Sequence, residues 1–380
     1  MVTRVSDPLA GEQPSRPRVA LVFGGRSSEH GVSCLTAGEV ARVIDPLAYD
    51  VVPVGIAPDG RWVLESVEGE RLALRGGRLP TVDGTGSDVA LAQDPTRREL
   101  VAGAAGEVPQ VLGQVDVVFP LLHGPWGEDG TLQGLLEMAG VRYVGAGVLA
   151  SALGMDKPVM KAVLRAAGLP VLPSVVLRPR EDPAAVRGSV AALGYPVFVK
   201  PARAGSSMGI SRVNGPEDLD AAVDAAREHD PKVLVEPGAI GARELECGVL
   251  DRLDGDTPEP SVVGEVRLHP DSGHTFYDFE AKYVDGTAQI DVPADLDEDI
   301  AARVQQLAVQ AFDVLGCEGL ARVDFFLLAD GSVVLNEVNT MPGFTATSMF
   351  PLLWQASGVD YPGLVDRLLR LALARPTGLR

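Results

Sequence analysis

The segment Leu320–Asn339 reads LARVDFFLLADGSVVLNEVN and contains two β-rich runs on either side of Asp330-Gly331. An Asp-Gly pair between two such runs is typical of a two-residue type I′ turn. The sequence therefore predicts a β-hairpin in which Ala329 pairs with Ser332. This hairpin is the most informative structural element of the chain, because its register decides which polar side chains face one another.

Counting outward from that pair, Asp324 faces Glu337 and Arg322 faces Asn339. Side chains alternate along a strand, so all four lie on one face. Directly opposite Cβ atoms are about 4.5–5.5 Å apart, and two carboxylates at that distance repel. A divalent cation reverses the sign, and Mg²⁺ prefers carboxylate and phosphate oxygens. The hairpin indicates a magnesium–phosphate site, and the alternative is a surface hairpin with polar residues on its solvent face.

A glycine- and serine-rich loop lies upstream of the hairpin. Its sequence is KPARAGSSMG, residues 200–209, and it connects a predicted strand at Pro196–Pro201 to another at Ile210–Val213. Small residues let backbone N–H groups approach phosphate oxygens. The loop does not match the Walker pattern. Its place between two strands favours a flap over phosphate, and a merely flexible turn is the alternative.

Two further loops are rich in glycine and polar groups. HGPWGEDGTLQG, residues 123–134, leads into a predicted helix at Thr131–Met138, whose N-terminus would attract anions. The alternative is an ordinary N-cap region in which Asp129 or Thr131 is the cap. MPGFTATSM, residues 341–349, offers backbone N–H groups and hydroxyls for an oxyanion or a carboxylate, unless it is a plain glycine turn.

The remaining periodicity predicts an α/β protein. A strand at Arg18–Gly25, a helix through Val43 and a strand at Asp50–Ile56 alternate as in a parallel α/β layer. Residues 58–112, rich in Gly, Asp and Pro, predict an irregular insertion. Other expected elements are a helix opened by Asp156-Lys157-Pro158, a strand at Lys232–Glu236, a hinge at Glu236–Glu244, and a helix at Asp299–Leu315 stopped by Gly316.

The composition limits the possible partners. A chain of 380 residues allows about two to three domains. The net charge of −19 disfavours binding to nucleic acid or to an anionic membrane. The three cysteines form no CxxC pair, which indicates reduced thiols and a cytoplasmic location. No apolar run approaches the ~18 residues of a membrane span. Residues 1–17 lack the apolar stretch of a secretory signal and predict a disordered tail.

Lysine is rare in this chain. It occurs only five times among 33 cationic residues, so a lysine within a motif is more informative than usual. Lys157 and Lys200 fall in motifs. We assign Lys161 and Lys232 to the surface as ordinary solvated cations.

Together these motifs resemble the D-alanine–D-alanine ligase family of the ATP-grasp superfamily, over about residues 18–370. The blocks GGRSSEHGVS, HGPWGEDGTLQG, MDK, VKPARAGSSMG, EAKY and ARVDFF…NEVNTMPGFTATS occur in the family's order. HGxxGEDG and RxD…NEVNTxPG are highly specific to it. One departure is Gly31, which stands where the family usually has an acid.

The resemblance implies an ATP-grasp fold of three domains. Residues 18–147 would form an N-terminal parallel α/β domain that binds the first D-alanine. Residues 148–237 would form a small central α+β domain with the phosphate loop. Residues 238–380 would form a C-terminal α+β domain with the metal and oxyanion sites, and ATP would bind between the last two.

The resemblance also implies a reaction, in which ATP drives the ligation of two D-alanines for peptidoglycan precursor synthesis. The first carboxylate attacks the γ-phosphorus to give an acyl phosphate. The second amine then attacks that carbonyl, and a tetrahedral intermediate expels phosphate. ATP, Mg²⁺ or Mn²⁺ as two ions, and a homodimer are implied. The alternatives are a D-alanine–D-lactate or another ATP-grasp carboxylate–amine ligase and, outside the enzymes, a nucleotide-binding sensor.

By motif position the resemblance assigns each site residue. The ATP phosphates would contact Lys157, Lys200, Ser206, Ser207, Met208, Gly209 and Lys282, while Glu236 would accept the adenine amino group and Glu244 would bind ATP elsewhere. The metal ligands would be Asp324, Glu337 and Asn339. The substrates and the oxyanion would be held by Glu29, His123, Arg322, Gly343, Ser348 and Met349. Tyr283 would link Glu29 to Ser206 and close a loop at about Phe276–Thr287.

Overall fold

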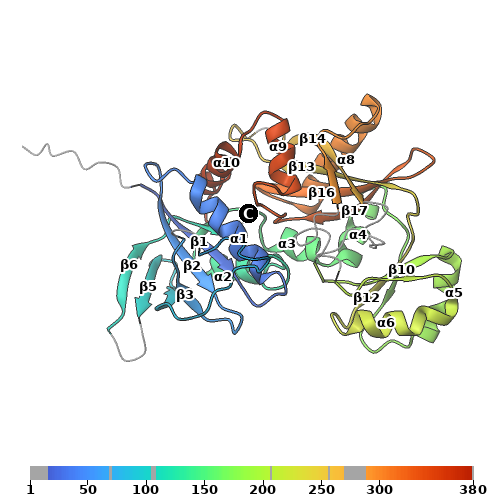
Figure 1. Cartoon of the computed structure of the whole chain (residues 1–380), viewed down its shortest axis with the longest axis horizontal. Helices are drawn as coiled ribbons and strands as arrows, with labels where there is room; N and C mark the ends of the chain where they lie inside the picture. Colours follow the sequence, from blue (N-terminus) through green and yellow to red (C-terminus); the bar gives the residue numbers. More distant parts are fainter. Residues whose placement is uncertain are drawn as a thin grey trace, which may run out of the picture.

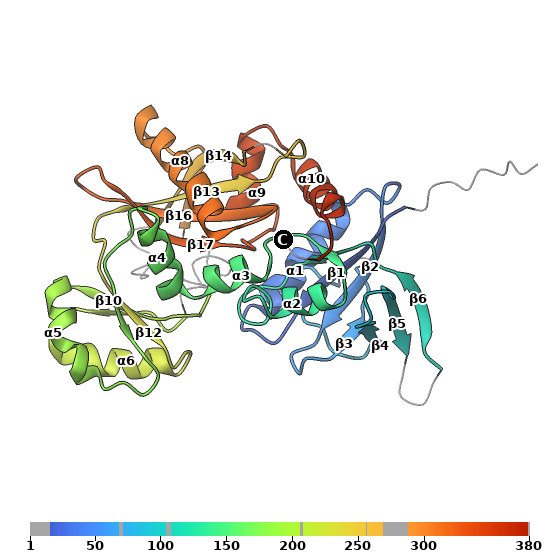
Figure 2. The same cartoon turned by 180° about the vertical axis from the view of Figure 1, so that it is seen from behind.

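The computed structural model describes residues 16–67, 71–103, 108–205, 208–255, 257–268 and 288–378. Within these ranges the strands form three sheets, and each sheet anchors one lobe of the molecule (Figure 1, and from behind in Figure 2). In the part of the chain so described, no helix is long and apolar enough to cross a membrane.

The first sheet has a parallel centre, as predicted. Its strands run in the order β6-β5-β4-β3-β2-β1-β7-β8, and β1 pairs in parallel with both β2 and β7. The central elements are β1 (Arg18–Gly24), α1 (His30–Val43), β2 (Asp50–Ile56), β7 (Val117–Pro120), α2 (Thr131–Met138) and β8 (Arg142–Tyr143). The carboxyl ends of β1 and β7 lead into the glycine loops of the predicted site.

The insertion at residues 58–112 is not irregular throughout, so that expectation is wrong. It adds antiparallel strands to the edge of the first sheet: β3 (Trp62–Leu64), β4 (Asp88–Leu91), β5 (Glu99–Gly103) and β6 (Gln110–Gln114). Each is only three to five residues long. Alternation over so few residues is a weak signal. The strands are fixed instead by burying side chains such as Val89, Leu100 and Ala102.

The second sheet is small and antiparallel, in the order β11-β10-β12-β9. Its elements are β9 (Val175–Leu177), α5 (Pro183–Leu193), β10 (Val197–Pro201), β11 (Ser211–Val213), a 3₁₀ turn at Pro216–Asp218, α6 (Leu219–Arg227) and β12 (Val233–Pro237). Both helices contribute to one core with the alternate strand residues Val197, Val199, Val233 and Val235, so they cover the same face. The strands predicted on either side of the phosphate loop are confirmed.

The third sheet carries the predicted hairpin, in the order β15-β14-β13-β16-β17. Its elements are β13 (Arg243–Leu250), β14 (Glu259–Leu268), β15 (Ala288–Asp291), α8 (Glu298–Leu315), β16 (Leu320–Leu327), β17 (Val333–Asn339), α9 (Met349–Ala356) and α10 (Tyr361–Ala374). Helix α8 covers one face and ends at Gly316, as predicted, where φ is +66°. Helix α9 packs near Gly248 and Gly264 on the other face.

The packing of three helices differs from the expected division into domains. Helices α3 (Val148–Met155) and α4 (Lys157–Ala166) follow the first sheet, and Asp156 caps α4 as predicted, through a 3.2 Å hydrogen bond from the Val159 N–H. Their apolar side chains join the core of the third sheet, not that of the second. Helix α10 likewise packs on the first sheet. Periodicity shows that a helix has an apolar face but does not show which core buries it.

The hairpin has the predicted pairs but not the predicted turn. Arg322 pairs with Asn339 and Asp324 with Glu337. The Leu328 N–H, however, donates to the Ser332 carbonyl, so the loop between them has three residues. The last of these is Gly331, at φ +82°. A β-bulge next to Asp324 leaves Asn336 unpaired and shifts the register back by one residue. The two shifts cancel, so the four polar side chains face one another as predicted.

Candidate active site

One cleft is lined by residues from all three lobes. Glu29 and His123 come from the first lobe, Lys200 from the second, and Glu337 from the third. The predicted site residues that line it are Glu29, His123, Lys157, Lys200, Met208, Arg322, Glu337, Asn339 and Gly343. The fold therefore brings together residues separated by more than 300 positions in the sequence.

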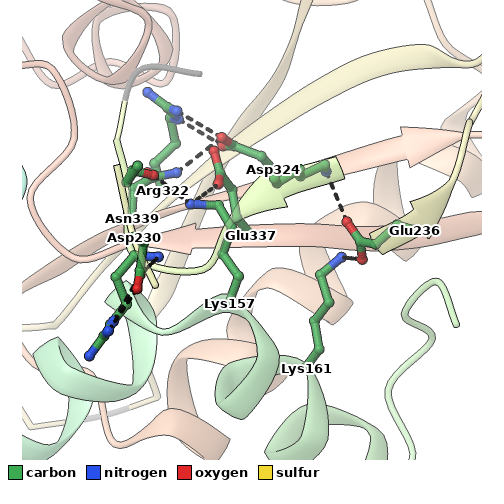
Figure 3. A network of polar contacts seen from close by, with 11 residues as sticks. Lys157, Lys161, Asp230, Glu236, Arg322, Asp324, Glu337 and Asn339 are labelled. Carbon is green, nitrogen blue, oxygen red and sulfur yellow. Dashed lines mark hydrogen bonds and ion pairs between the residues drawn. The ribbon is translucent and has the colours of Figure 1, made fainter. Parts of the chain in front are cut away.

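A row of three acids crosses the third sheet at this cleft, and Figure 3 shows two of them, Asp324 and Glu337, with Arg322. Glu246 on β13 is in register with Asp324 on β16, which is in register with Glu337 on β17. Arg322 Nε lies 2.8 Å from Glu246 Oε2 and 2.7 Å from Asp324 Oδ1, and its Nη2 lies 2.7 Å from Asp324 Oδ2. Burial alone would lower the pKa of Arg322, but Asp324 and Glu246 raise it, so the guanidinium stays charged. Sequence reasoning missed Glu246, whose strand pairing was not predicted.

Protein cations reduce the repulsion that the hairpin argument assigned to metal alone. Lys157 Nζ lies 3.3 Å from Glu337 Oε2 and donates a 3.0 Å hydrogen bond to the Ala204 carbonyl. Three acids and two cations leave this cluster with a formal charge of 2 − 3 = −1. A divalent ion is therefore not the only counter-charge to these carboxylates. The residual negative charge still favours a cation.

The predicted ligand set fits a hard metal ion. Asp324, Glu337 and Asn339 supply carboxylate and amide oxygens, and the Asn339 amide already contacts Asp324, with Nδ2 3.0 Å from Oδ2. The described ranges hold no group of three or more His, Cys, Asp or Glu arranged for a metal. A Mg²⁺ ion needs only a few protein ligands where phosphate oxygens and water complete its coordination shell.

The Glu29 carboxylate lies against two glycine backbones. A Cβ at Gly124 would stand 2.8 Å from Glu29 Oε2, and a Cβ at Gly205 would stand 2.5 Å from it. A side chain at either position would displace this carboxylate, so the phosphate loop reaches Glu29 only because Gly205 has none.

His123 presents a hydrogen-bond acceptor beside Glu29. Its ring is 5% exposed, and Nδ1 lies 3.2 Å from the Met341 carbonyl. Burial lowers the pKa of His123, although Glu29 opposes the shift, and the ring is neutral at pH 7. Nδ1–H then donates to Met341, and Nε2 is an acceptor without a partner among the described residues. This nitrogen and the Glu29 carboxylate both accept hydrogen bonds, a combination that suits an ammonium group.

Glu128 joins two loops of the site, and the sequence indicated it only as one of two acids. Its Oε2 accepts a 2.6 Å hydrogen bond from the Gly124 N–H, and its Oε1 accepts one of 3.3 Å from the Met341 N–H. Burial, helped by the charge of Glu29, raises the pKa of Glu128 to about 8. Burial therefore moves the pKa of Glu128 close to neutral pH.

Glu128 is expected to make stability fall as pH rises. The native protein keeps its proton up to about pH 8, whereas the unfolded chain loses it near 4.5, so the stabilisation is complete below pH 4.5 and is lost towards pH 8. Glu128→Gln should remove this slope, which is at most about 1.4 kcal/mol per pH unit. Urea unfolding at pH 5.5 and 7.5 measures it, with exposed Glu298→Gln as control. Parallel curves for wild type and Glu128→Gln would contradict this role.

Of the two lysines assigned to the surface as solvated cations, Lys161 is buried, so that assignment is wrong, and Lys232 is only partly exposed. Lys161 is 1% exposed, and its Nζ lies 2.5 Å from Glu236 Oε1 (Figure 3). Lys232 Nζ lies 2.7 Å from both carboxylate oxygens of Asp156. Both acids lie about 75 residues away from their lysines, so local periodicity could not reveal the pairs.

Some predicted site residues lie apart from this cleft or outside the described ranges. Ser348 Oγ contacts Thr345 Oγ1 at 2.7 Å, Met349 packs in a small core with Leu353, and Glu244 is a paired residue of β13. Gly209 turns at φ +70° against His229. Four predicted site residues and one predicted loop lie outside the described residues: Ser206, Ser207, Lys282 and Tyr283, and the loop at 276–287.

Packing explains why Gly31 has no side chain. A Cβ at Gly31 would lie 2.5 Å from the Leu79 Cβ. Leu79 belongs to the insertion after β3, which here covers the first turns of α1. An acid at position 31 would force that cover to move.

Comparisons with known proteins point to one family. Residues 18–146 match the model for the D-ala D-ala ligase N-terminus, and residues 163–370 match the model for its C-terminus. The chain is 57% identical to a D-alanine–D-alanine ligase of Streptomyces griseus over 376 residues, covering 96% of this chain and 95% of that protein. It is 56% identical to one of Mycolicibacterium vanbaalenii, covering 96% and 100%.

Solved structures give the same fold. The VanG D-Ala:D-Ser ligase of Enterococcus faecalis superposes with a TM-score of 0.80 at 36% identity, covering 94% of this chain and all of that one. The D-alanine–D-alanine ligase of Coxiella burnetii gives 0.77 at 34% identity, covering 94% of each chain. The fold class is thereby confirmed as ATP-grasp. Taken with the two family matches, these likenesses show that the chain belongs to the D-alanine–D-alanine ligase family.

Proposed function

We propose that this protein joins two D-alanines into D-alanyl-D-alanine, with ATP as energy source and an acyl phosphate as intermediate, for peptidoglycan precursor synthesis. One observation carries the proposal. Arg322, Glu337 and Asn339 of the polar hairpin face line the same cleft as Lys157 and Lys200, and Glu29 and His123 line it as well. Two lysines and a carboxylate face suited to a metal ion therefore lie in one cleft with a pair of acceptors suited to an ammonium group.

The nucleotide end of the cleft would hold ATP. Lys157 and Lys200 bind its phosphates, Met208 and Gly209 cover them together with Ser206, Ser207 and Lys282, and Glu236 accepts from the adenine amino group. Asp324, Glu337 and Asn339 would hold Mg²⁺ or Mn²⁺, in our proposal two ions, which supply positive charge to the transferred phosphoryl group. The oxygen-only donor set and the net charge of the cluster support this assignment.

The other end would hold the amino acids. Glu29 and the neutral His123 bind the ammonium of the first D-alanine, which points its carboxylate towards the phosphates. Ser348 and Met349 bind the carboxylate of the second. Arg322 and the Gly343 N–H stabilise the tetrahedral oxyanion, as fixed donors do in acyl transfer. Tyr283 would close the site and exclude the water that would hydrolyse the acyl phosphate.

We also propose a cytoplasmic homodimer. Cys34, Cys247 and Cys317 are buried free thiols, which suits a reducing compartment. A sensor without catalysis is a weaker candidate, because it would not need Arg322 beside the phosphate site. D-serine is a second candidate acceptor, since one solved relative is a D-Ala:D-Ser ligase.

The activity is tested by measuring phosphate release and product together. With ATP, Mg²⁺ and D-alanine alone, we expect one dipeptide per phosphate. Adding D-serine or D-lactate at neutral pH should give mixed products at less than about a tenth of that rate. A mixed product as the main species would move the proposal to that acceptor, and no dipeptide from D-alanine would overturn it.

A further inference from the structure

A buried carboxylate is held between two lysines, of which one lines the cleft (Figure 3). Glu236, at the end of β12, is 1% exposed. Its Oε1 lies 2.5 Å from Lys161 Nζ on α4, and its Oε2 lies 2.8 Å from Lys200 Nζ on β10. Lys200 lines the cleft, whereas Lys161 lies behind Glu236, 1% exposed.

Stability alone does not explain Lys161. Taking an ammonium group out of water costs several kcal/mol, and replacing both partners of a buried ion pair by apolar side chains is often neutral or stabilising, although removing one partner alone is destabilising. In the described part of the chain, Lys161 Nζ makes no regular hydrogen bond beyond this ion pair. A methionine of similar length would fill the same space on α4 beside Leu164. The lysine is therefore better explained by what its charge does to Glu236.

We propose that Lys161 is a positioning residue that keeps Glu236 ionised while ATP is bound, and that it thereby selects a 6-aminopurine over a 6-oxopurine. The inference rests on the proposed function, in which Glu236 accepts from the adenine amino group. Lys161 itself touches no substrate.

Once a nucleotide binds, Lys200 no longer interacts with Glu236 alone. Its ammonium lies 2.8 Å from Glu236 Oε2, and in the proposed complex it also binds phosphate. The charges that face this carboxylate are Lys161 from α4 and Lys200 from β10, with Glu337 on β17 and Glu244 on β13 near the lysines. Burial alone would raise the pKa of Glu236, and the two lysines lower it to about 2. With Lys200 engaged elsewhere, Lys161 is the cation that remains.

The ionisation state of Glu236 decides which purine it prefers. An ionised carboxylate only accepts hydrogen bonds, so it pairs with the amino group at C6 of adenine and repels the carbonyl oxygen at C6 of hypoxanthine. A protonated carboxyl can donate to that carbonyl. ATP and ITP differ at C6, which carries an amino group or a carbonyl, and at N1, which carries a proton only in hypoxanthine. The change of their affinity ratio between wild type and variant therefore reports the charge on Glu236.

The test is equilibrium binding of ATP and of ITP, without D-alanine, to the wild type and to Lys161→Met at pH 6 and pH 8. We expect Lys161→Met to lose about 10- to 100-fold in ATP affinity, the loss of one hydrogen bond to a charged group, with little change for ITP. The loss should be larger at pH 6. Lys232→Met removes a lysine from a more exposed ion pair and is the matched control, for which the ATP:ITP ratio should not change.

Two further variants separate the possible outcomes. Lys161→Gln keeps a hydrogen-bond donor but has no charge, so it should change the ATP:ITP ratio as Lys161→Met does. It is the second neutral variant to measure if Lys161→Met folds poorly. In a Glu236→Gln background, Lys161→Met should change the ratio no further. Equal losses for both nucleotides, or a pH-independent ratio in Lys161→Met, would overturn the inference. Failure of the proposed function would differ, because the wild type would then bind neither nucleotide or make no dipeptide.

Discussion

Glu337→Gln is expected to lower kcat about 1000-fold or more while the protein still folds. Glu337 carries one of the two carboxylates proposed to hold the metal, and a neutral amide there weakens both metal binding and the stabilisation of the transferred phosphoryl group. Losing one preorganised electrostatic contact typically costs 10²–10³ in kcat, and losing a metal costs several kcal/mol more. The effect should persist at saturating Mg²⁺.

Folding should survive this change because Glu337 is 24% exposed and its ion pair with Lys157 spans 3.3 Å. A partly exposed pair of that kind stabilises a protein by about 1 kcal/mol or less. Steady-state kinetics with titrated Mg²⁺, together with thermal unfolding, measure both expectations. Glu259→Gln makes the same chemical change in the same sheet, outside the cleft, and should keep full activity. Wild-type turnover by Glu337→Gln would remove the metal assignment.

The hairpin shows how far register can be predicted from sequence. Alternation and the Asp-Gly turn signal placed Asp324 opposite Glu337, and the structure confirms that pair. The predicted turn was one residue too short, and the bulge at Asn336 restores the predicted pairing of Asp324 with Glu337. Neither feature has a strong local signal, because both depend on how the sheet twists against its neighbours. The right pairs followed from two deviations that cancel.

The residues that sequence reasoning missed depend on contacts between distant strands and helices. Glu246 joins the acid row only because β13 lies beside β16, and Lys161, on a helix that packs against the third sheet, meets Glu236 only because the fold brings the end of β12 to it. Sequence patterns show the alternation within each element but not which elements become neighbours. Motif residues such as Lys157, Arg322 and Gly343 could be predicted, because the family resemblance implies which motifs come together in the fold.

Arg322→Lys is expected to separate the two halves of the reaction. The guanidinium bridges Glu246 and Asp324 through a fork of donors, and a lysine ammonium is a point charge that cannot hold both acids in the same geometry. In our proposal Arg322 acts chiefly on the tetrahedral oxyanion, so dipeptide formation should fall about 1000-fold. The acyl phosphate should still form and then be hydrolysed. ADP release should therefore exceed dipeptide formation, whereas the wild type gives one of each.

A matched control decides whether that uncoupling belongs to the oxyanion site. Arg243 makes an equally close two-pronged contact with Glu265, at 2.8 and 2.7 Å, on the neighbouring strand β13 but away from the lining of the cleft. Arg243→Lys should therefore cost some stability and leave the ratio of ADP to dipeptide at one. If Arg322→Lys instead lowers ADP release and dipeptide formation in equal measure, Arg322 acts before the acyl phosphate forms, and its place must be sought in phosphoryl transfer. If both variants uncouple the reaction, the cause lies in the sheet as a whole and not in the charge that faces the carbonyl.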